Sequence, residues 1–380
     1  MDLLRCALPE PNPALAGFAR RPRIQTAALN ALTEAREGYP YPAPTLARWF
    51  RKARYLGARD RRTVTEVVYS VIRHEHLLTR VTLARGEDPV LETLVKTWPE
   101  LAEGARFEEL LSSSPAEDYA TALSLPYDIA REWLDRLGPG DAAKLARVLA
   151  RRAPTTIRAN QAQCTREQLR ERLVAEGLET TPCALTSLGL TLERPAQLHT
   201  LESFREGWFE VQDAASQLLC EALPLDVGTT VLDLCAGAGG KSLALAARGA
   251  QVLAHDIRSH ALDQLDKRAS RAGAQVEVGP PRPCQVVLVD APCSGTGRIR
   301  REPSLRWNLQ PHEHLQTQIQ LLEQARQWVE PGGLLAYATC SLLEAENEHR
   351  VEGWIQDEHR TLWPHEHGCD GMVWTFWRQE

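Results

Sequence analysis

Two cysteines in this sequence each follow the end of an apolar run. Residues 284–297 read CQVVLVDAPCSGTG, so that Cys293 comes three residues after Asp290. Residues 332–341 read GGLLAYATCS and place Cys340 at the end of a second run. A single buried cysteine usually serves as a small apolar side chain. Two thiols, each just past the carboxyl end of a strand, where open α/β sheets bind their ligands, indicate thiol chemistry.

The residues after each thiol suggest which one is the nucleophile. Ser341 and Glu344 have the S-x-x-E spacing of a capping box, which predicts a helix directly after Cys340. A helix N-terminus stabilises a nearby anion and lowers the pKa of a thiol. Cys293 is followed by Ser-Gly-Thr-Gly, which predicts a flexible loop without such a cap. We therefore expect Cys340 to attack.

A glycine-rich turn follows an earlier apolar run, TVLDL, and is a candidate binding loop. It comprises Cys235, Ala236, Gly237, Ala238, Gly239, Gly240 and Lys241. A P-loop would need glycine where Cys235 stands, and a dinucleotide fingerprint would need glycine where Ser242 stands. What remains is a tight turn that lets a ligand approach the backbone at a helix N-terminus, or a loop that is glycine-rich for packing alone.

Asp256 follows the next apolar run, nineteen residues after Gly237. A carboxylate at this position can accept hydrogen bonds from both hydroxyl groups of a ribose. The loop and Asp256 together predict a ligand that carries an adenosine-like ribose.

Composition sets limits on these interpretations. The chain has 380 residues, 43% hydrophobic and 25% charged, with a net charge of −6. We expect two or three globular domains, no membrane span, no secretory signal and a monomer. Nine cysteines without a C-x-x-C pair favour neither a disulfide framework nor a zinc site, and suggest a reducing cytoplasm. The acidic balance does not favour nucleic acid, but arginines cluster at 20–23, 51–62 and 298–306.

The elements that must position these residues fall into three predicted domains. Residues 1–140 have helical periodicity, for example Val64, Val67, Val68 and Val71, and predict an all-α domain with loops at 112–118 and 137–141. Residues 141–212 predict a small α+β subdomain: strands at 155–160, 188–193 and 208–213, and a helix at 165–177 with a T-x-x-Q capping box and Gly177 as its stop.

From residue 213 to 380, strands alternate with helices. This alternation predicts an α/β fold with a Rossmann-like, doubly wound and mostly parallel sheet. Residues 372–379 are predicted to form its last strand, at an edge of the sheet.

Four segments of the sequence resemble a known family. LDLCAGAGGKS, VDAPCSGTGRIRREPSLRW and YATCSLLEAEN are similar to three signature blocks of the Sun (RsmB-like, NSUN-type) RNA cytosine-C5 methyltransferases, and GWFEVQDAASQ (207–217) to a fourth. The resemblance covers 205–380. It extends more loosely to the α+β segment and to an N-terminal helical domain similar to the NusB fold.

The resemblance implies a Rossmann-like methyltransferase that uses S-adenosyl-L-methionine and binds RNA, most often ribosomal RNA. In this family the Thr-Cys thiol, here Cys340, adds to C6 of cytosine, and the Pro-Cys thiol, here Cys293, assists release. Asp290 would hold the cytosine ring, and residues 235–241, Asp256 and Asp290 would line the cofactor site. No metal is implied.

The residues that follow each have a functional and a purely structural interpretation. Lys241 could contact the base or a phosphate, or be a solvated lysine. Arg298, Arg300, Arg301 and Arg306 with Trp307 offer phosphate contacts and a stacking face for single-stranded RNA, or a solvated loop.

The chain also departs from the family pattern. It has Gly237-Ala238 where relatives have Ala-Pro, and VGPPRP (278–283) where relatives carry an acidic residue for the cofactor's adenine side. Because of residues 278–283, a non-catalytic RNA-binding assembly factor is one alternative function. Within the methyltransferase class, a transfer-RNA enzyme is the other alternative.

Overall fold

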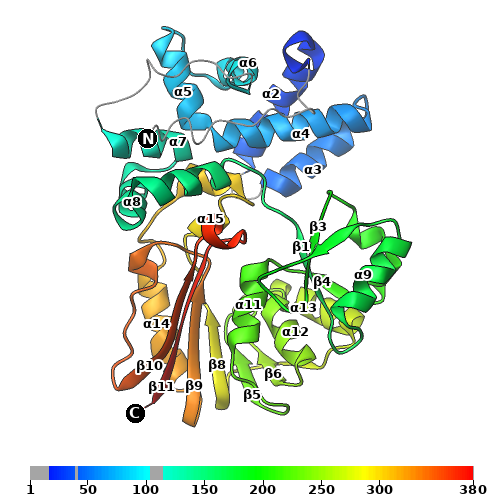
Figure 1. Ribbon diagram of the computed structural model, residues 1–380, viewed down its shortest axis with the longest axis vertical. Helices are drawn as coiled ribbons and strands as arrows, with labels where there is room; N and C mark the ends of the chain where they lie inside the picture. Colours follow the sequence, from blue (N-terminus) through cyan, green and yellow to red (C-terminus); the bar gives the residue numbers. More distant parts are fainter. Residues whose placement is uncertain (1–16, 39–41, 103–113, 380) are drawn as a thin grey trace. The chain divides into compact units, whose positions relative to one another are not determined.

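The computed structural model describes residues 17–38, 42–102 and 114–379 (Figure 1). It divides into two compact units, Met1–Arg152 with Arg298–Gln310, and Ala153–Gly297 with Pro311–Glu380. The segment Arg298–Gln310 therefore belongs to the N-terminal unit, although it lies within the region that the sequence assigns to the catalytic domain.

The N-terminal unit is helical in all its described elements, as predicted. In α4 the valines at 64, 67, 68 and 71 form one stripe and are at most 1% exposed, because their spacing of three and four residues puts them on one helix face. The described helices are η2 (Phe18–Arg20), α2 (Pro22–Glu37), α3 (Pro42–Lys52), α4 (Ala58–Arg73), α5 (Glu75–Ala84), α6 (Leu91–Ala102), α7 (Pro115–Leu123), α8 (Tyr127–Leu149) and η6 (Pro303–Asn308).

Two predicted loops of this unit are largely helical. Ser114 accepts a hydrogen bond from the Glu117 amide and Pro115 occupies the first turn, so α7 begins inside the predicted loop 112–118, whose residues 112–113 lie outside the described part. The predicted loop 137–141 is a kink within α8, where Gly138 adopts φ +66° in front of Pro139. Serine and proline start helices as readily as they form turns, which is why the loop prediction was wrong at 115–118.

Arg306 joins the ends of two helices of the N-terminal unit. It is 7% exposed, and its guanidinium donates to the carbonyl oxygens of Leu123 (2.9 Å), Leu149 (3.3 Å) and Ile299 (2.7 Å). Leu123 and Leu149 are the last residues of α7 and α8, whose carbonyls have no partner within their helices. Arg306 therefore has a structural role in place of the phosphate contact expected from the sequence.

The second unit contains two sheets. The smaller has the order β2-β3-β1-β4 and is antiparallel, with strands β1 (Thr156–Ala159), β2 (Thr180–Pro182), β3 (Gly189–Leu192) and β4 (Phe209–Val211). The predicted capping box is confirmed at Thr165 and Gln168, where α9 (Arg166–Ala175) begins, and Gly177 follows its end with φ +80°. A 3-10 turn, η4 (Leu198–Thr200), and α10 (Glu202–Arg205) lead into β4.

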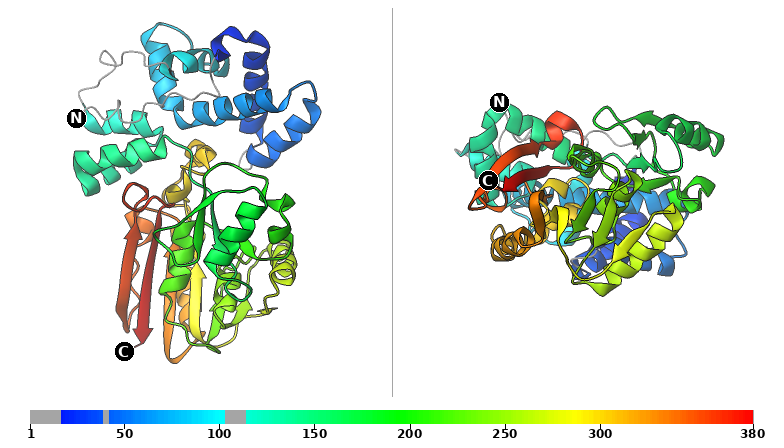
Figure 2. Two further views of the ribbon diagram at one scale, coloured as in Figure 1. Left: turned by 45° about the vertical axis from the view of Figure 1, so that its right-hand side comes forward. Right: turned by 90° about the horizontal axis from the view of Figure 1, so that it is seen from below.

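The larger sheet has the order β10-β11-β9-β8-β5-β6-β7 and is parallel from β9 to β7, which confirms the predicted α/β class. Helices cover both of its faces (Figure 2): α11 and α12 contribute to one core cluster and α14 to the other. The strands are β5 (Thr230–Asp233), β6 (Gln251–Ala254), β7 (Val276–Val278), β8 (Cys284–Asp290), β9 (Val329–Thr339), β10 (Trp354–Leu362) and β11 (Met372–Gln379). The helices are α11 (Ala214–Ala222), α12 (Gly240–Ala247), α13 (Ser259–Ala272), α14 (Leu315–Arg326) and α15 (Pro364–His367), with 3-10 turns η5 (Thr296–Arg298) and η7 (Glu344–Glu346).

The last strand is not the edge strand that the sequence predicted. β11 pairs antiparallel with both β10 and β9, so β10 forms this edge. The reason lies in the sequence itself: residues 372–377 are all buried and, except for Thr375, apolar, which suits an interior strand, whereas β10 is mostly exposed. No described helix is long and apolar enough to cross a membrane.

Arg306→Ala should lower the free energy of unfolding by about 3 kcal/mol, because two helix-end carbonyls would lose their donor. Chemical denaturation followed by circular dichroism measures this value. Arg298→Ala is the matched control, since Arg298 is exposed and pairs with Glu302 on the surface (3.0 Å). Equal stability of the two variants would contradict a structural role for Arg306.

Candidate active site

The two thiols lie side by side at the carboxyl ends of neighbouring strands. β8 and β9 are parallel, with Asp290 opposite Ala338, so the two strands end at the same level of the sheet. Cys293 and Cys340 follow within three residues, and their Sγ atoms are 3.4 Å apart. Both are free thiols and only partly buried. The prediction that both thiols face one site at this edge of the sheet thus has a geometric basis.

No helix follows Cys340, so the argument from a helix cap was wrong. Ser341 Oγ accepts a hydrogen bond from the amide of Leu343 (3.1 Å), and residues 344–346 form only a single 3-10 turn. A three-residue turn aligns too few peptide dipoles to stabilise an anion as a helix does. The helix-cap argument therefore does not distinguish the two thiols.

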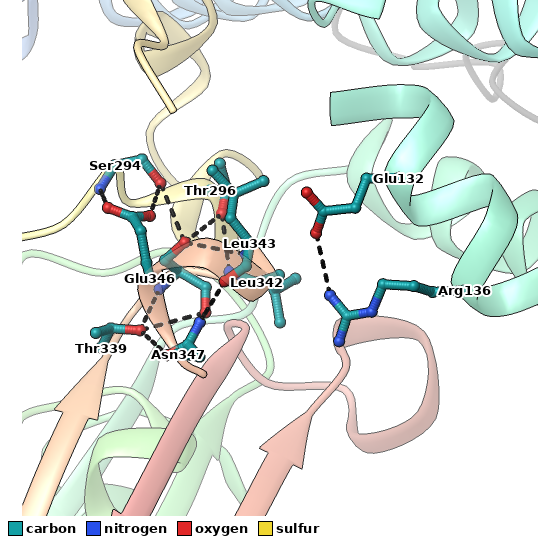
Figure 3. A network of polar contacts seen from close by, with 10 residues as sticks. Glu132, Arg136, Ser294, Thr296, Thr339, Leu342, Leu343, Glu346 and Asn347 are labelled. Atoms are coloured by element: carbon teal, nitrogen blue, oxygen red, sulfur yellow. Dashed lines mark hydrogen bonds and ion pairs between the residues drawn. The ribbon is translucent and has the colours of Figure 1, made fainter. Parts of the chain in front are cut away.

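The two loops that carry the thiols are bound to each other by hydrogen bonds (Figure 3). Thr296 Oγ1 accepts from the amide of Leu342 (2.9 Å), and Ser294 Oγ lies 3.1 Å from Ser341 Oγ. Gly297 donates its amide hydrogen to the carbonyl oxygen of Cys340 (2.9 Å). The Ser-Gly-Thr-Gly segment that the sequence suggested as a flexible loop is therefore fixed against the residues beyond Cys340.

Asn347 holds the turn after Cys340 in place. Its amide group donates to the carbonyl oxygens of Ser341 (3.1 Å) and Leu343 (2.8 Å), and its oxygen accepts from Thr339 Oγ1 (2.7 Å). Sequence reasoning did not single out Asn347, although it stands in the quoted block YATCSLLEAEN.

Lys241 and Asp290 form an ion pair at the same edge of the sheet. Lys241 Nζ is 2.5 Å from Asp290 Oδ2, and the lysine side chain is 11% exposed. Burial favours the neutral amine, but the adjacent Asp290 carboxylate outweighs it and raises the pKa of Lys241. The lysine is therefore charged and held against the strand that leads to Cys293, not solvated.

The glycine loop has the backbone shape that the sequence suggested. Gly237 and Gly239 adopt φ +55° and +81°, in the left-handed region, and Gly239 packs so closely on Leu265 that a Cβ atom would be 2.6 Å from its Cγ. α12 begins at Gly240, directly after these turns. Ala236 is buried, and burial raises the pKa of the Cys235 thiol to about 12, so this thiol stays protonated.

Side chains from the small sheet and α13 hold this loop. Arg268 Nη1 donates to the carbonyl oxygen of Ala238 (2.6 Å), and Gln212 Nε2 donates to that of Gly240 (3.2 Å). Glu210, 3% exposed, accepts from Arg268 (2.9 Å) and Arg271. Sequence reasoning missed Glu210 and Arg268; Glu210 and Gln212 do lie in the quoted block GWFEVQDAASQ.

Asp256 contacts the glycine loop directly. Its Oδ2 accepts from the amide of Gly237 (2.8 Å), and both carboxylate oxygens also accept from Arg258. Burial alone would raise the pKa of Asp256, but the hydrogen bonds from Arg258 and Gly237 lower it to about 2. The carboxylate is thus charged and lies at the loop, where the sequence predicted it.

Asp233 is a further buried carboxylate that sequence reasoning overlooked. It is 1% exposed, its Oδ2 accepts from Ser242 Oγ (2.6 Å), and within the described residues its Oδ1 has no hydrogen-bond partner. Burial raises the pKa of Asp233 to about 6. An unpartnered oxygen beneath a glycine loop, with Asp256 beside the loop, fits a ligand that brings hydrogen-bond donors.

The predicted RNA-binding residues belong to the N-terminal unit. Arg298 is exposed and pairs with Glu302, and Arg300 and Arg301 are partly buried. The Trp307 indole donates to Glu75 (2.7 Å), and its ring lies 5.7 Å from the guanidinium carbon of Arg36. Binding of RNA by these four residues stays a prediction. Among the described residues, no group of three or more His, Cys, Asp or Glu side chains could hold a metal ion.

Comparison with known proteins agrees with this geometry. Residues 221–366 match the family model for 16S rRNA methyltransferase RsmB/F, and residues 129–199 match the ferredoxin-like domain of RsmF/B-like methyltransferases. In these two segments the chain is similar to the RsmB/F methyltransferases.

Curated relatives of this family extend the comparison. Ribosomal RNA small subunit methyltransferase B of Vibrio cholerae is 36% identical over 221 residues, 54% of this chain and 51% of that protein. The protein of the same name from Escherichia coli O6:K15:H31 is 37% identical over 221 residues, 54% of this chain and 52% of that protein. The chain thus spans about half the length of the curated relatives it matches.

Solved structures support the fold. The crystal structure of PH0851 is 21% identical, covers 93% of this chain and 98% of its own, and has a TM-score of 0.75. NSun6 from Pyrococcus horikoshii is 17% identical, covers 67% of this chain and 98% of its own, and has a TM-score of 0.60. At these identities the likeness concerns the fold alone.

Asp256→Asn should lower the free energy of unfolding by about 1–2 kcal/mol above pH 5, and the difference from the unmutated chain should shrink as the pH falls toward 2. The sign follows from a folded pKa of about 2 against the ordinary value of 3.8: the carboxylate stabilises the fold above the unfolded pKa and loses this effect through the folded one. Urea unfolding at several pH values measures the difference, with the exposed Asp266→Asn as control. A pH-independent difference would contradict the ionised Asp256.

Proposed function

We propose that the chain is an S-adenosyl-L-methionine-dependent RNA methyltransferase that forms 5-methylcytosine in ribosomal RNA. The observation that carries this proposal is the pair of thiols 3.4 Å apart at the carboxyl ends of β8 and β9. The names of the curated relatives, ribosomal RNA small subunit methyltransferase B, support the substrate class.

The chemistry requires a nucleophile because C5 of cytosine is too weakly nucleophilic to accept a methyl group directly. Cys340 as a thiolate adds to C6, the ring electrons move to C5, and C5 forms the new bond to the methyl carbon. S-adenosyl-L-methionine, when bound, supplies that methyl group as an electrophile. Loss of the C5 proton to water then restores the ring double bond and expels Cys340 as a thiolate, and Cys293 beside it assists this step by donating its thiol proton to the departing sulfur.

Asp290 and Lys241 would orient the base. Asp290 ends β8 three residues before Cys293, and its ion pair with Lys241 fixes the position of its carboxylate. A carboxylate there accepts a hydrogen bond from the exocyclic amine of cytosine, which distinguishes cytosine from uracil.

The residues present fit S-adenosyl-L-methionine. The left-handed turns at Gly237 and Gly239 let a ligand reach the backbone before α12, and Asp256 lies where a ribose would meet it. Arg258, whose side chain is 59% exposed, occupies both Asp256 oxygens and has to release at least one to the ribose hydroxyls. Residues 278–283 offer no carboxylate for the adenine side of the cofactor. Cofactor binding therefore depends more strongly on Asp256 than in relatives that have such a carboxylate.

The Cys340 and Cys293 variants should differ in whether they trap RNA. Cys340→Ala should form no covalent adduct and transfer no methyl group, because the attacking sulfur is gone. Cys293→Ala should still attack and methylate but stall at release, and accumulate as a protein–RNA band on a denaturing gel. Cys284→Ala, a buried cysteine at the opposite end of β8, is the control. An adduct in Cys340→Ala but not in Cys293→Ala would reverse the two roles.

Asp256 and Arg258 should have opposite effects on cofactor affinity. Asp256→Ala should weaken S-adenosyl-L-methionine binding by at least about tenfold, since two hydrogen bonds to a charged acceptor are lost. Arg258→Ala should bind at least as tightly as the unmutated chain, because the carboxylate no longer has to be released. Isothermal titration gives both values. No binding by the unmutated chain would favour the non-catalytic RNA-binding factor.

A further inference from the structure

Glu346 is a buried carboxylate beside the thiol pair that the proposed chemistry does not use. It is 0% exposed and accepts hydrogen bonds from the Ser294 amide (2.9 Å), Ser294 Oγ (2.5 Å) and Gln318 Nε2 (3.2 Å). Its own carbonyl accepts from the Tyr337 hydroxyl (3.0 Å). Among the described residues no cation forms an ion pair with it. A buried charge held only by neutral donors is costly, which suggests that the charge serves a purpose.

Glu346 and Gln318 hold Cys293 from both sides. Gln318 Nε2, which donates to Glu346, also donates to the carbonyl oxygen of Pro292 (2.9 Å). His349 Nε2 lies 3.4 Å from Gln318 Oε1. The residue before Cys293 and the residue after it are therefore both fixed by this network, part of which is drawn in Figure 3, and the position of the Cys293 sulfur is fixed with them.

The charge of Glu346 acts on Cys293, because the carboxylate is hydrogen-bonded to the next residue, Ser294. Two sulfurs 3.4 Å apart cannot both ionise readily, so one keeps its proton and donates it toward the other. The hydrogen bond to Cys340, burial, and the neighbouring carboxylate of Glu346 all raise the pKa of Cys293 well above its ordinary value. The thiol next to Ser294 is thus the one that stays protonated.

Other ionisable groups around Cys293 do not offset this effect. The Asp290 carboxylate is ion-paired with Lys241, and burial raises the pKa of Tyr337 and of Cys235, which keeps both neutral. Burial also lowers the pKa of His349, which disfavours a cation there.

We propose that Glu346 is a positioning residue that, together with Gln318, fixes Cys293 as the protonated member of the thiol pair and so reserves the thiolate for Cys340. This assignment of the proton stands on the hydrogen bonds from Ser294 that place the Glu346 carboxylate next to Cys293, and its meaning for methyl transfer rests on the proposed function. It also supplies the asymmetry between the thiols that the missing helix cap does not provide.

The test measures the reactivity of each thiol without RNA or cofactor. The reduced chain is treated with iodoacetamide at several pH values, and the alkylation rates of Cys293 and Cys340 are followed separately by peptide mass spectrometry. In the unmutated chain Cys340 should react faster. Glu346→Gln, which keeps the shape but removes the charge, should raise the rate at Cys293 about tenfold at a given pH, equal to about one pKa unit.

Control variants separate the charge from the packing. Glu348→Gln removes an exposed carboxylate two residues away and should leave both rates unchanged. Gln318→Met loosens the hold on Pro292 but keeps the charge, so the pH profile of Cys293 should not move to lower pH. If Glu346→Gln does not fold, Glu346→Asp, which withdraws the carboxylate by one methylene group, should shift the profile part of the way.

Two results would overturn the proposal. One is an unchanged Cys293 profile in a folded Glu346 variant, and the other is a Cys293 that outreacts Cys340 in the unmutated chain. Methylation assays form a separate arm, in which Glu346→Gln should lower kcat more than it raises KM. An unmutated chain that alkylates as expected but methylates no RNA would count against the proposed function while leaving the role of Glu346 intact.

Discussion

The parallel pairing of β8 with β9 is the constraint on which the candidate site depends. Because Asp290 lies opposite Ala338, both strands end at the same level, and the short segments that follow bring Cys293 and Cys340 to 3.4 Å. A shift of this register by two residues would separate the sulfurs by several ångströms, since a strand rises about 3.3 Å per residue. Hydrogen bonds between the two loops then secure a distance that the sheet has already set.

Buried charge in the second unit is held by hydrogen bonds in two different ways. Glu210 is paired with two arginines, one of which also supports the glycine loop, so its charge is neutralised and its role is to join the small sheet to that loop. Glu346 and Asp233 accept hydrogen bonds from hydroxyl, amide or backbone donors, so the negative charge of each carboxylate still acts on neighbouring ionisable groups. Such uncompensated carboxylates shift the pKa of their neighbours or of themselves, and such shifts often mark functional sites.

The segment Arg298–Gln310 shows how one stretch of sequence can serve a different purpose from the one its composition suggests. Its arginines look like a phosphate-binding loop, yet Arg306 is buried at the ends of α7 and α8 and Trp307 donates to Glu75. Helix ends carry carbonyls without partners, and a guanidinium with five donors can satisfy several at once. A cluster of arginines can therefore reflect helix capping as well as nucleic-acid binding.

The sequence by itself determined the fold class, the two thiols at strand ends, the glycine turns and the position of Asp256. These features depend on local patterns: apolar periodicity, glycine at left-handed positions, and strand-to-loop transitions. The tertiary structure alone decided that β11 is an interior strand, that Arg306 is structural, and that no helix follows Cys340. It also brought Glu346 and Gln318, distant in sequence from Cys293, to either side of that thiol. Those outcomes depend on which segments compete for the same donors and the same buried space, and that competition is settled only when the whole chain has packed.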